Sequence, residues 1–182
     1  MTLRVISGGQ TGADIAGLWA AKLFGIPTGG WAPKNFITLA GNHPEMATTF
    51  GMKEHARSYR GRTIENLSAS DLTIVCSQVM SAGTKLTIKE CQRLKIPHSI
   101  FMIDPFDLEK SLAKPSLAIV RNTIRLWSGL GLFTVNIAGN STANCPRAFE
   151  FTFKLCYRLF TDLGYKTDAS ETDWVMYQDK WE

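Results

Sequence analysis

Ser7-Gly8-Gly9-Gln10-Thr11-Gly12-Ala13-Asp14 is the stretch that decides the fold, because it joins an apolar run over residues 3–6 to a segment of helical character. A strand, a glycine turn and a helix in this order let the backbone approach a ligand, and the first N–H groups of the helix favour an anion. The stretch is neither a G-x-G-x-x-G dinucleotide fingerprint nor a Walker loop, since no Gly-Lys-Ser/Thr follows. A tight connection without any ligand is an alternative that this stretch alone leaves open.

The same layout recurs along the chain. Continuous apolar runs predict strands that are covered on both faces, and a helical pattern follows each of them. The strands are expected at 72–76, 97–103 and 132–137, and the helices at 13–24, 85–95, 117–129 and from Pro146 to Gly164. This alternation predicts an α/β fold, namely a Rossmann-like, open, mostly parallel sheet with helices on both faces. We expect a single ligand-binding domain over residues 1–167 and an acidic, aromatic tail over residues 168–182.

Composition restricts the class of partner. The net charge of +4 divides into about −4 from residue 168 onward, where five acidic residues face one lysine, and about +8 for the body before it. The body therefore favours a small anion. Nucleic acid is a less favoured partner, because aromatic residues are not interleaved with a dense basic stripe. With neither a leader pattern nor an apolar run long enough to span a bilayer, we expect a cytoplasmic protein without membrane contact.

Cysteine and histidine spacing indicates no metal site. The four cysteines lie far apart without a C-x-x-C pair, so we expect buried free thiols rather than zinc ligands or disulfides. The three histidines share no metal-ligand spacing.

Small-residue turns follow three of the predicted strands, at 8–12, 81–84 and 138–142. Right-handed crossovers place the turns at the carboxyl ends of the strands, where doubly wound folds bind ligands. We therefore predict the ligand site at this edge, helped by two nearby cationic side chains. The predicted ligand-binding residues are Gly8, Gly9, Gln10, Thr11, Gly12, Asp14, Gly30, Lys34, Arg62, Ser81, Gly83, Thr84, Asn136 and Asn140. Because Asp14 would repel a phosphate placed directly on it, it is expected to cap the helix, to orient a loop or to meet a ribose hydroxyl.

Six short motifs occur in the order Gly8-Gly9-Gln10-Thr11-Gly12-x-Asp14, Gly25-Ile26-Pro27-Thr28-Gly29-Gly30-Trp31-x-Pro33-Lys34, Arg62-Thr63-x-x-Asn66, Ser70-Asp71, Gly83-Thr84-x-Leu86-Thr87 and Asn136-x-Ala138-Gly139. Together they resemble the molybdenum-cofactor carrier family. That family is similar to the cytokinin-activating phosphoribohydrolases, once described as lysine decarboxylases, within one Rossmann-like superfamily. The resemblance implies a ligand such as a pterin-nucleotide or another nucleotide, a site over the glycine turns, and a homodimer or higher homo-oligomer.

The chain also departs from these patterns. In the hydrolase branch a Gly-Thr-x-x-Glu element supplies a catalytic glutamate, whereas here Thr87 follows Gly83-Thr84-Lys85-Leu86 and the nearest carboxylate is Glu90. Relative to the carrier pattern, Ile15 replaces a basic residue, Trp19 replaces an acidic one, and Leu39-Ala40 replaces an acidic pair. These differences favour a site specialised for binding, or for a different ligand.

Three functions remain open from the sequence. The favoured one is a non-enzymatic protein, acting as carrier, sensor or sequestering protein, that binds a small phosphate-bearing nucleotide-like ligand. The second is a hydrolase that cleaves an N-glycosidic or phosphate bond of a nucleotide, with Asp14 or Glu90 as the weak candidates for the acid/base. The third is a non-catalytic interaction protein with a vestigial site.

Overall fold

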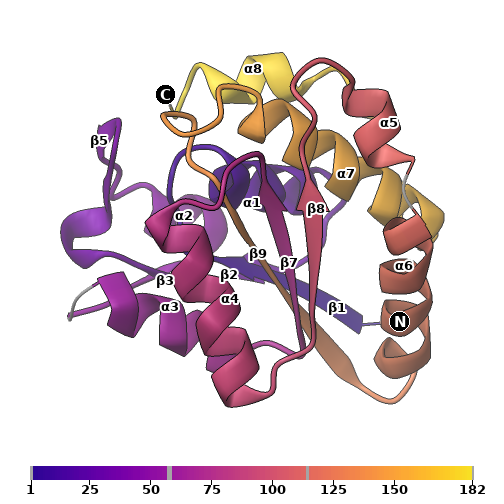
Figure 1. Cartoon of the computed structure of the whole chain (residues 1–182), viewed down its shortest axis with the longest axis horizontal. Helices are drawn as coiled ribbons and strands as arrows, with labels where there is room; N and C mark the ends of the chain where they lie inside the picture. The colour runs from indigo at the N-terminus through magenta and orange to yellow at the C-terminus, as the bar shows by residue number, and fades with distance from the viewer. Residues whose placement is uncertain (1, 57–58, 114, 182) are drawn as a thin grey trace.

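Five parallel strands form the central sheet of the computed structural model, which describes residues 2–56, 59–113 and 115–181 (Figure 1). The strands are β1 (Thr2–Ser7), β2 (Thr28–Gly29), β7 (Leu72–Ser77), β8 (His98–Met102) and β9 (Leu132–Gly139). Every pairing within this sheet is parallel. The predicted Rossmann-like α/β fold is therefore confirmed.

The last strand in the sequence occupies the middle of the sheet. The order is β2-β1-β9-β7-β8, so β9 pairs with β1 on one side and with β7 on the other. Counted from β9, this order reads 3-2-1-4-5, as in doubly wound folds that begin with their central strand. The strand order reverses between β9 and β7, and ligands of such folds bind outside the carboxyl ends of the strands at this point.

Helices cover both faces of the sheet (Figure 1). On one face α1 (Ala13–Leu23) packs along α7 (Ala148–Asp162), and α6 (Pro115–Ser128) lies beside α7. On the other face α3 (Tyr59–Ser68) packs against α4 (Ala82–Leu94). The remaining elements are short: β3 (Trp31–Ala32), η1 (Lys34–Phe36), β4 (Ile37–Thr38), β5 (Gly41–Asn42), α2 (Met46–Phe50), β6 (Lys53–Glu54), α5 (Leu108–Leu112) and α8 (Trp174–Gln178).

Several elements differ from the sequence-based expectation. Pro33, Gly41, Asn42 and Pro44 predict an irregular surface loop over residues 32–49, but this segment contains the antiparallel β4–β5 hairpin and α2. The many charged residues over 52–66 predict a segment too polar for a core element, but α3 begins there and buries Arg62 and Asn66. Helix α4 starts three residues before the predicted position, because the Ser81 side chain caps it by accepting a hydrogen bond from Thr84 N at 3.2 Å. In the connection after β8, Asp107 caps the unpredicted α5 in the same way.

The acidic tail packs on its own chain. Helix α8 contacts α7 and α1, and the Tyr177 ring lies 4.5 Å from that of Trp19. The Trp181 ring is buried 4.7 Å from His43 and 5.7 Å from Phe50. Since His43 directly follows β5, the tail supports the base of the β4–β5 hairpin.

Buried thiols and helix lengths agree with the sequence. All four cysteines are buried and free, as predicted. Within the described residues, none of the helices has both the length and the apolar character needed to cross a membrane.

The contact between α1 and β9 can be tested at a helical glycine. A Cβ at Gly17 would lie 2.6 Å from Ile137 Cγ2. We expect Gly17→Ala to lower the free energy of unfolding by about 1–3 kcal/mol through overpacking, although alanine has the better helix propensity. Gly83 in α4 is the matched control, because only Ser81 Oγ, at 4.0 Å, approaches its Cβ position. Gly83→Ala should leave stability unchanged or raise it by up to about 1 kcal/mol. Equal effects in urea denaturation would contradict the close packing of α1.

Candidate functional site

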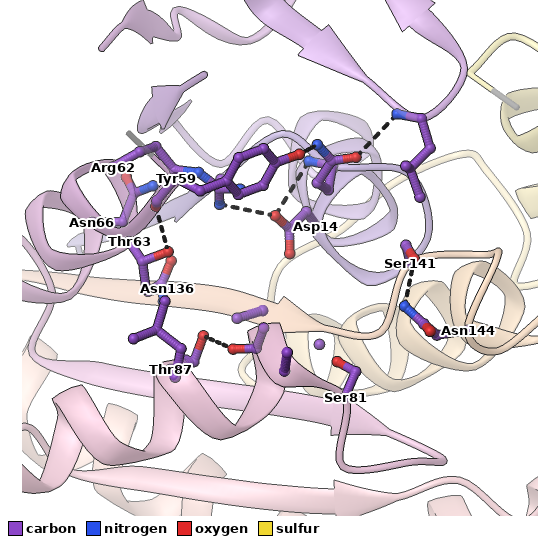
Figure 2. A pocket seen from close by; sticks show the side chains of 18 residues that line it. Asp14, Tyr59, Arg62, Thr63, Asn66, Ser81, Thr87, Asn136, Ser141 and Asn144 are labelled. Atoms are coloured by element: carbon purple, nitrogen blue, oxygen red, sulfur yellow. Dashed lines mark hydrogen bonds and ion pairs between the residues drawn. The ribbon is translucent and has the colours of Figure 1, made fainter. Parts of the chain in front are cut away.

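A cavity of about 360 Å³ opens at the carboxyl edge of the sheet, where the three small-residue turns meet α3 (Figure 2). This size is within the usual range for small-molecule sites. The lining consists of Gly8, Gln10, Asp14, Leu39, Tyr59, Arg62, Thr63, Asn66, Ser81, Ala82, Gly83, Leu86, Thr87, Asn136, Ala138, Gly139, Ser141 and Asn144. The turns that the sequence assigned to one edge therefore border one cavity.

The structure brings some of the predicted ligand residues to the cavity and leaves others outside it. Those that line it are Gly8, Gln10, Asp14, Arg62, Ser81, Gly83 and Asn136. Those that do not are Gly9, Thr11, Gly12, Gly30, Lys34, Thr84 and Asn140. Lys34 is exposed on η1, and Thr84 is buried behind Ser81, with 3.0 Å between their hydroxyl oxygens.

The N-terminus of α1 is closed by the protein itself. Ala13 N donates to Asn140 O at 3.1 Å, and Ile15 N donates to Gln10 O at 3.2 Å. Gly12 has a φ of 81°, and a Cβ there would lie 2.6 Å from Asn140 O, so the glycine permits this close approach of two turns. The first glycine turn thus uses part of its backbone for packing rather than for the cavity.

The N-terminus of α4, in contrast, faces the cavity. Ser81, Ala82 and Gly83 belong to the lining. The N–H groups in the first turn of a helix have no partner within the helix, and its dipole favours a negative charge there. Because Ser81 Oγ accepts the hydrogen bond from Thr84 N at 3.2 Å, an anion at the start of α4 would meet the N–H groups of Ala82 and Gly83.

Asn140 joins two of the turns through its side chain and a third through its backbone. Its Oδ1 accepts hydrogen bonds from Gln78 N at 2.8 Å and Val79 N at 3.0 Å, and its Nδ2 donates to Thr84 Oγ1 at 3.1 Å. Its carbonyl oxygen accepts the hydrogen bond from Ala13 N described above. The residue is only 1% exposed, so its amide is committed to the fold.

Arg62 and Asp14 are the charged residues of the lining. Arg62 Nη1 lies 3.5 Å from Asp14 Oδ2, and both side chains are about nine-tenths buried. Figure 2 shows the guanidinium reaching from α3 toward the Asp14 carboxylate. A Cβ at Gly8 would lie 1.4 Å from Arg62 Nη1, so only glycine leaves room for the guanidinium at this backbone position. Arg62 Nε is buried without a hydrogen-bond partner, which leaves one donor of this cation unsatisfied.

Burial raises the pKa of the Asp14 carboxyl above its usual value of 3.8, and the Arg62 charge opposes that increase. Asp14 Oδ2 also accepts a hydrogen bond from Gln10 N at 3.2 Å, so the carboxylate orients the first turn. Glu90, the other candidate acid/base, does not line the cavity. Hydrogen bonds from Arg93 and Arg60 lower the pKa of Glu90 below its usual value of 4.5.

Sequence reasoning missed a polar face of α3. Tyr59, Thr63 and Asn66 line the cavity together with Arg62. Their positions follow the i, i+3, i+4, i+7 spacing of one helix face, which was the signal available in the sequence. Leu39, Thr87, Ser141 and Asn144 also line the cavity but lie outside the predicted set.

Other parts of the described chain offer fewer polar side chains that could bind a ligand or a metal ion. No group of three histidine, cysteine, aspartate or glutamate side chains among the described residues is arranged to hold a metal ion. A second hollow of about 390 Å³ at the amino edge is largely apolar, and its carboxylate, Asp71, accepts a hydrogen bond from Thr134 N at 2.7 Å.

Comparison with known proteins agrees with this architecture. The model of the circularly permutated YpsA SLOG family matches residues 5–160. A similar solved structure is that of a Syntrophus aciditrophicus SB protein named "Putative molybdenum carrier protein". It is 29% identical with a TM-score of 0.68, and the match covers 89% of this chain and 94% of that chain. No curated protein matches the chain. The central position of β9 fits a permuted connectivity, and the family resemblance indicated by the motifs is confirmed.

Removal of the Asn140 amide should destabilise the protein strongly. Asn140→Ala removes the acceptor of Gln78 N and Val79 N and the donor to the buried Thr84 hydroxyl, and a buried group left unsatisfied costs about 1–3 kcal/mol. We expect a loss of at least about 3 kcal/mol in chemical denaturation. Asn144→Ala in the same turn is the control, because this residue is exposed and its side-chain amide donates to Ser141 Oγ, at 3.1 Å, at the surface. The free energy of unfolding of Asn144→Ala should stay within about 0.5 kcal/mol of wild type.

The two candidate carboxylates should give pH dependences of opposite sign. The folded-state pKa of Asp14 is raised, so its stabilising contribution is present below pH 3.8 and is lost as pH rises through the folded pKa. Wild type should therefore lose stability relative to Asp14→Asn as pH rises through that window. The folded-state pKa of Glu90 is lowered, so wild type should gain stability relative to Glu90→Gln as pH rises toward 4.5. Denaturation at several pH values measures both slopes, and equal signs would be inconsistent with these environments.

Proposed function

Because the chain belongs to the circularly permutated YpsA SLOG family, we propose that it is a molybdenum-carrier-type protein that holds a small phosphate-bearing, nucleotide-like ligand. The observation that carries the proposal is the cavity at the carboxyl edge, which combines the first turn of α4 with a buried arginine. Both features suit an anion. Carrier, sensor and sequestering protein are variants of this one function.

The ligand phosphate would bind at the start of α4 rather than at the start of α1. Ser81, Ala82 and Gly83 line the cavity, whereas backbone carbonyls already occupy the N–H groups of Ala13 and Ile15. Asp14 would also repel an anion from the α1 side. This assignment revises the expectation that the phosphate lies on the turn at residues 8–12.

Neutral polar side chains would hold the rest of the ligand. Thr63, Thr87 and Asn136 supply hydroxyl and amide groups on two walls of the cavity, whereas the Asn66 amide is bonded to the Trp31 backbone. Such groups suit sugar hydroxyls and the edges of a heterocyclic ring. The name of the Syntrophus protein and the motif resemblance favour a pterin-nucleotide that carries molybdenum as the cargo. The homo-oligomeric state and the cytoplasmic location stay predictions.

A hydrolase is the second candidate, and the observation that favours it is the position of Asp14. This buried carboxyl lines the cavity and has a raised pKa, as a general acid often has. Its ion pair with Arg62 and its hydrogen bond from Gln10 N give it a structural role as well. Asp14→Asn separates the candidates, because a hydrolase would lose turnover of a nucleotide panel while a binder has none to lose.

Native mass spectrometry of protein purified from its host tests the proposal directly. A tightly held ligand should appear as an added mass that is lost on denaturation. If the native protein carries no added mass and no phosphorylated compound raises its melting temperature, the vestigial-site alternative replaces the proposal.

Loss of the buried cation should weaken binding selectively. Arg62→Gln is expected to reduce the affinity for nucleoside monophosphates or a pterin phosphate by about 10- to 100-fold, since a hydrogen bond to a charged group contributes about 1.5–3 kcal/mol. Arg60→Gln is the matched control, because this side chain is on the same helix, is 62% exposed and pairs with Glu90 away from the cavity. Isothermal titration calorimetry measures both, with circular dichroism to verify folding. Equal losses in the two variants would contradict the proposed anion site.

A further inference from the structure

Two large, exposed side chains border the cavity. Leu39, between the strands of the β4–β5 hairpin, is 63% exposed, and Tyr59, the first residue of α3, is 50% exposed. Both belong to the lining, whose other walls carry mostly glycines, hydroxyls and amides. Exposed apolar surface at a ligand cavity indicates contact with an apolar part of the ligand.

The side-chain amide of the half-buried Gln10 holds these two residues together. Gln10 Nε2 donates a hydrogen bond to the Tyr59 hydroxyl, and Gln10 Oε1 accepts one from Leu39 N at 3.2 Å. Gln10 Nε2 also lies 3.4 Å from the carbonyl oxygen of Ile37. The side chain of the first turn therefore fixes the hairpin and the start of α3, which are distant in sequence, against each other.

The Tyr59 ring has one occupied face. Arg62 Cζ lies 5.1 Å from the ring centroid, in a cation–π arrangement. Half of the residue's surface is exposed and the residue lines the cavity, so ring surface that Arg62 does not cover is accessible there. Figure 2 shows the ring extending along the cavity above the Arg62 and Asp14 pair. An accessible aromatic face backed by a cation is a suitable surface for a second planar ring.

We propose that Tyr59 and Leu39 bind the planar ring of the ligand, and that Gln10 is the positioning residue that keeps them apart at a fixed distance. This inference rests on the proposed function, because it assigns the ring subsite of the same cavity. It predicts selectivity, because contact with this surface should raise the affinity for a purine or pterin compound and should not raise the affinity for a sugar phosphate. Tyr59 and Leu39 thus determine specificity, and the anion site does not.

The test compares ring-bearing and ring-free probes by calorimetry. Adenosine monophosphate, guanosine monophosphate and a pterin phosphate carry a ring, whereas ribose 5-phosphate and inorganic phosphate do not. Wild type should bind at least one ring-bearing probe about tenfold or more tightly than ribose 5-phosphate. Tyr59→Ala and Leu39→Ser should each reduce that preference, Tyr59→Ala by about tenfold, without changing the affinity for ribose 5-phosphate.

Matched variants separate ring contact from general damage. Tyr59→Phe keeps the ring and should keep most of the preference. Trp127→Ala and Leu130→Ser change residues that are 54% and 79% exposed at the hollow on the opposite edge, and should have no effect on binding. Gln10→Ala should reduce the preference severalfold at an unchanged melting temperature. Gln10→Glu retains an acceptor for Leu39 N and for the Tyr59 hydroxyl, and should therefore keep part of the preference for ring-bearing probes that Gln10→Ala loses.

The outcomes distinguish this inference from the proposed function. The proposed ring subsite is wrong, while phosphate binding stands, in either of two cases. In the first, Tyr59→Ala lowers the affinity for ribose 5-phosphate as much as the affinity for the ring-bearing probes. In the second, wild type binds the two classes of probe equally well. If none of the probes binds to wild type, the proposed function fails and the ring subsite fails with it.

Discussion

The hydrogen bonds of Asn140 are the interaction on which the carboxyl edge of the sheet depends. A single buried residue accepts from the backbone of the turn after β7, donates to Thr84 and accepts from the start of α1. The three turns come from strands that are neighbours in the sheet but distant in sequence. Strand pairing brings the ends of β1, β9 and β7 together, and the Asn140 hydrogen bonds then fix the turns beyond the strands. The cavity between the turns is therefore shaped by hydrogen bonds of the fold itself.

The electrostatics of the site follow from one buried ion pair. Gly8 leaves space for the Arg62 guanidinium, and Asp14 provides the opposite charge at 3.5 Å. A buried pair of this kind stabilises a fold only when its hydrogen bonds are satisfied, and Arg62 Nε is not satisfied within the described protein. One donor of Arg62 is thus left without a partner beside the cavity, while the largely positive body would attract an anion over a longer range.

The sequence predicted the fold class because each βα unit carries a local signal, namely an apolar run, a small-residue turn and a helical pattern. It did not predict that β9 lies between β1 and β7, because strand pairing is non-local and all the central strands are similarly apolar. Of the glycines predicted to bind the ligand, Gly8 and Gly83 line the cavity, whereas Gly9, Gly12 and Gly30 do not. A glycine pattern indicates close backbone approach, but it does not indicate whether a ligand or, as at Gly12, another turn makes that approach.

The polar face of α3 shows a different limit of sequence interpretation. Tyr59, Arg62, Thr63 and Asn66 have helical spacing, yet a polar stripe normally indicates a solvent-exposed face. Only the packing of α3 against α4 reveals that this stripe faces a cavity. The sequence likewise could not predict that Lys34 lies outside the cavity. The short η1 turn that exposes Lys34 depends on a left-handed backbone at Asn35, whose φ is 57°.

The central position of β9 also determines when the protein can fold during its synthesis. Strands β1 and β7 have no hydrogen-bonded contact with each other and share β9 as their neighbour. Until residues 132–139 have left the ribosome, each of these strands has an unpaired edge of buried, apolar sequence. The nascent chain therefore carries one open strand edge after β1 is made and two after β7 is made, until β9 follows, which is a state that chaperones bind and that favours aggregation.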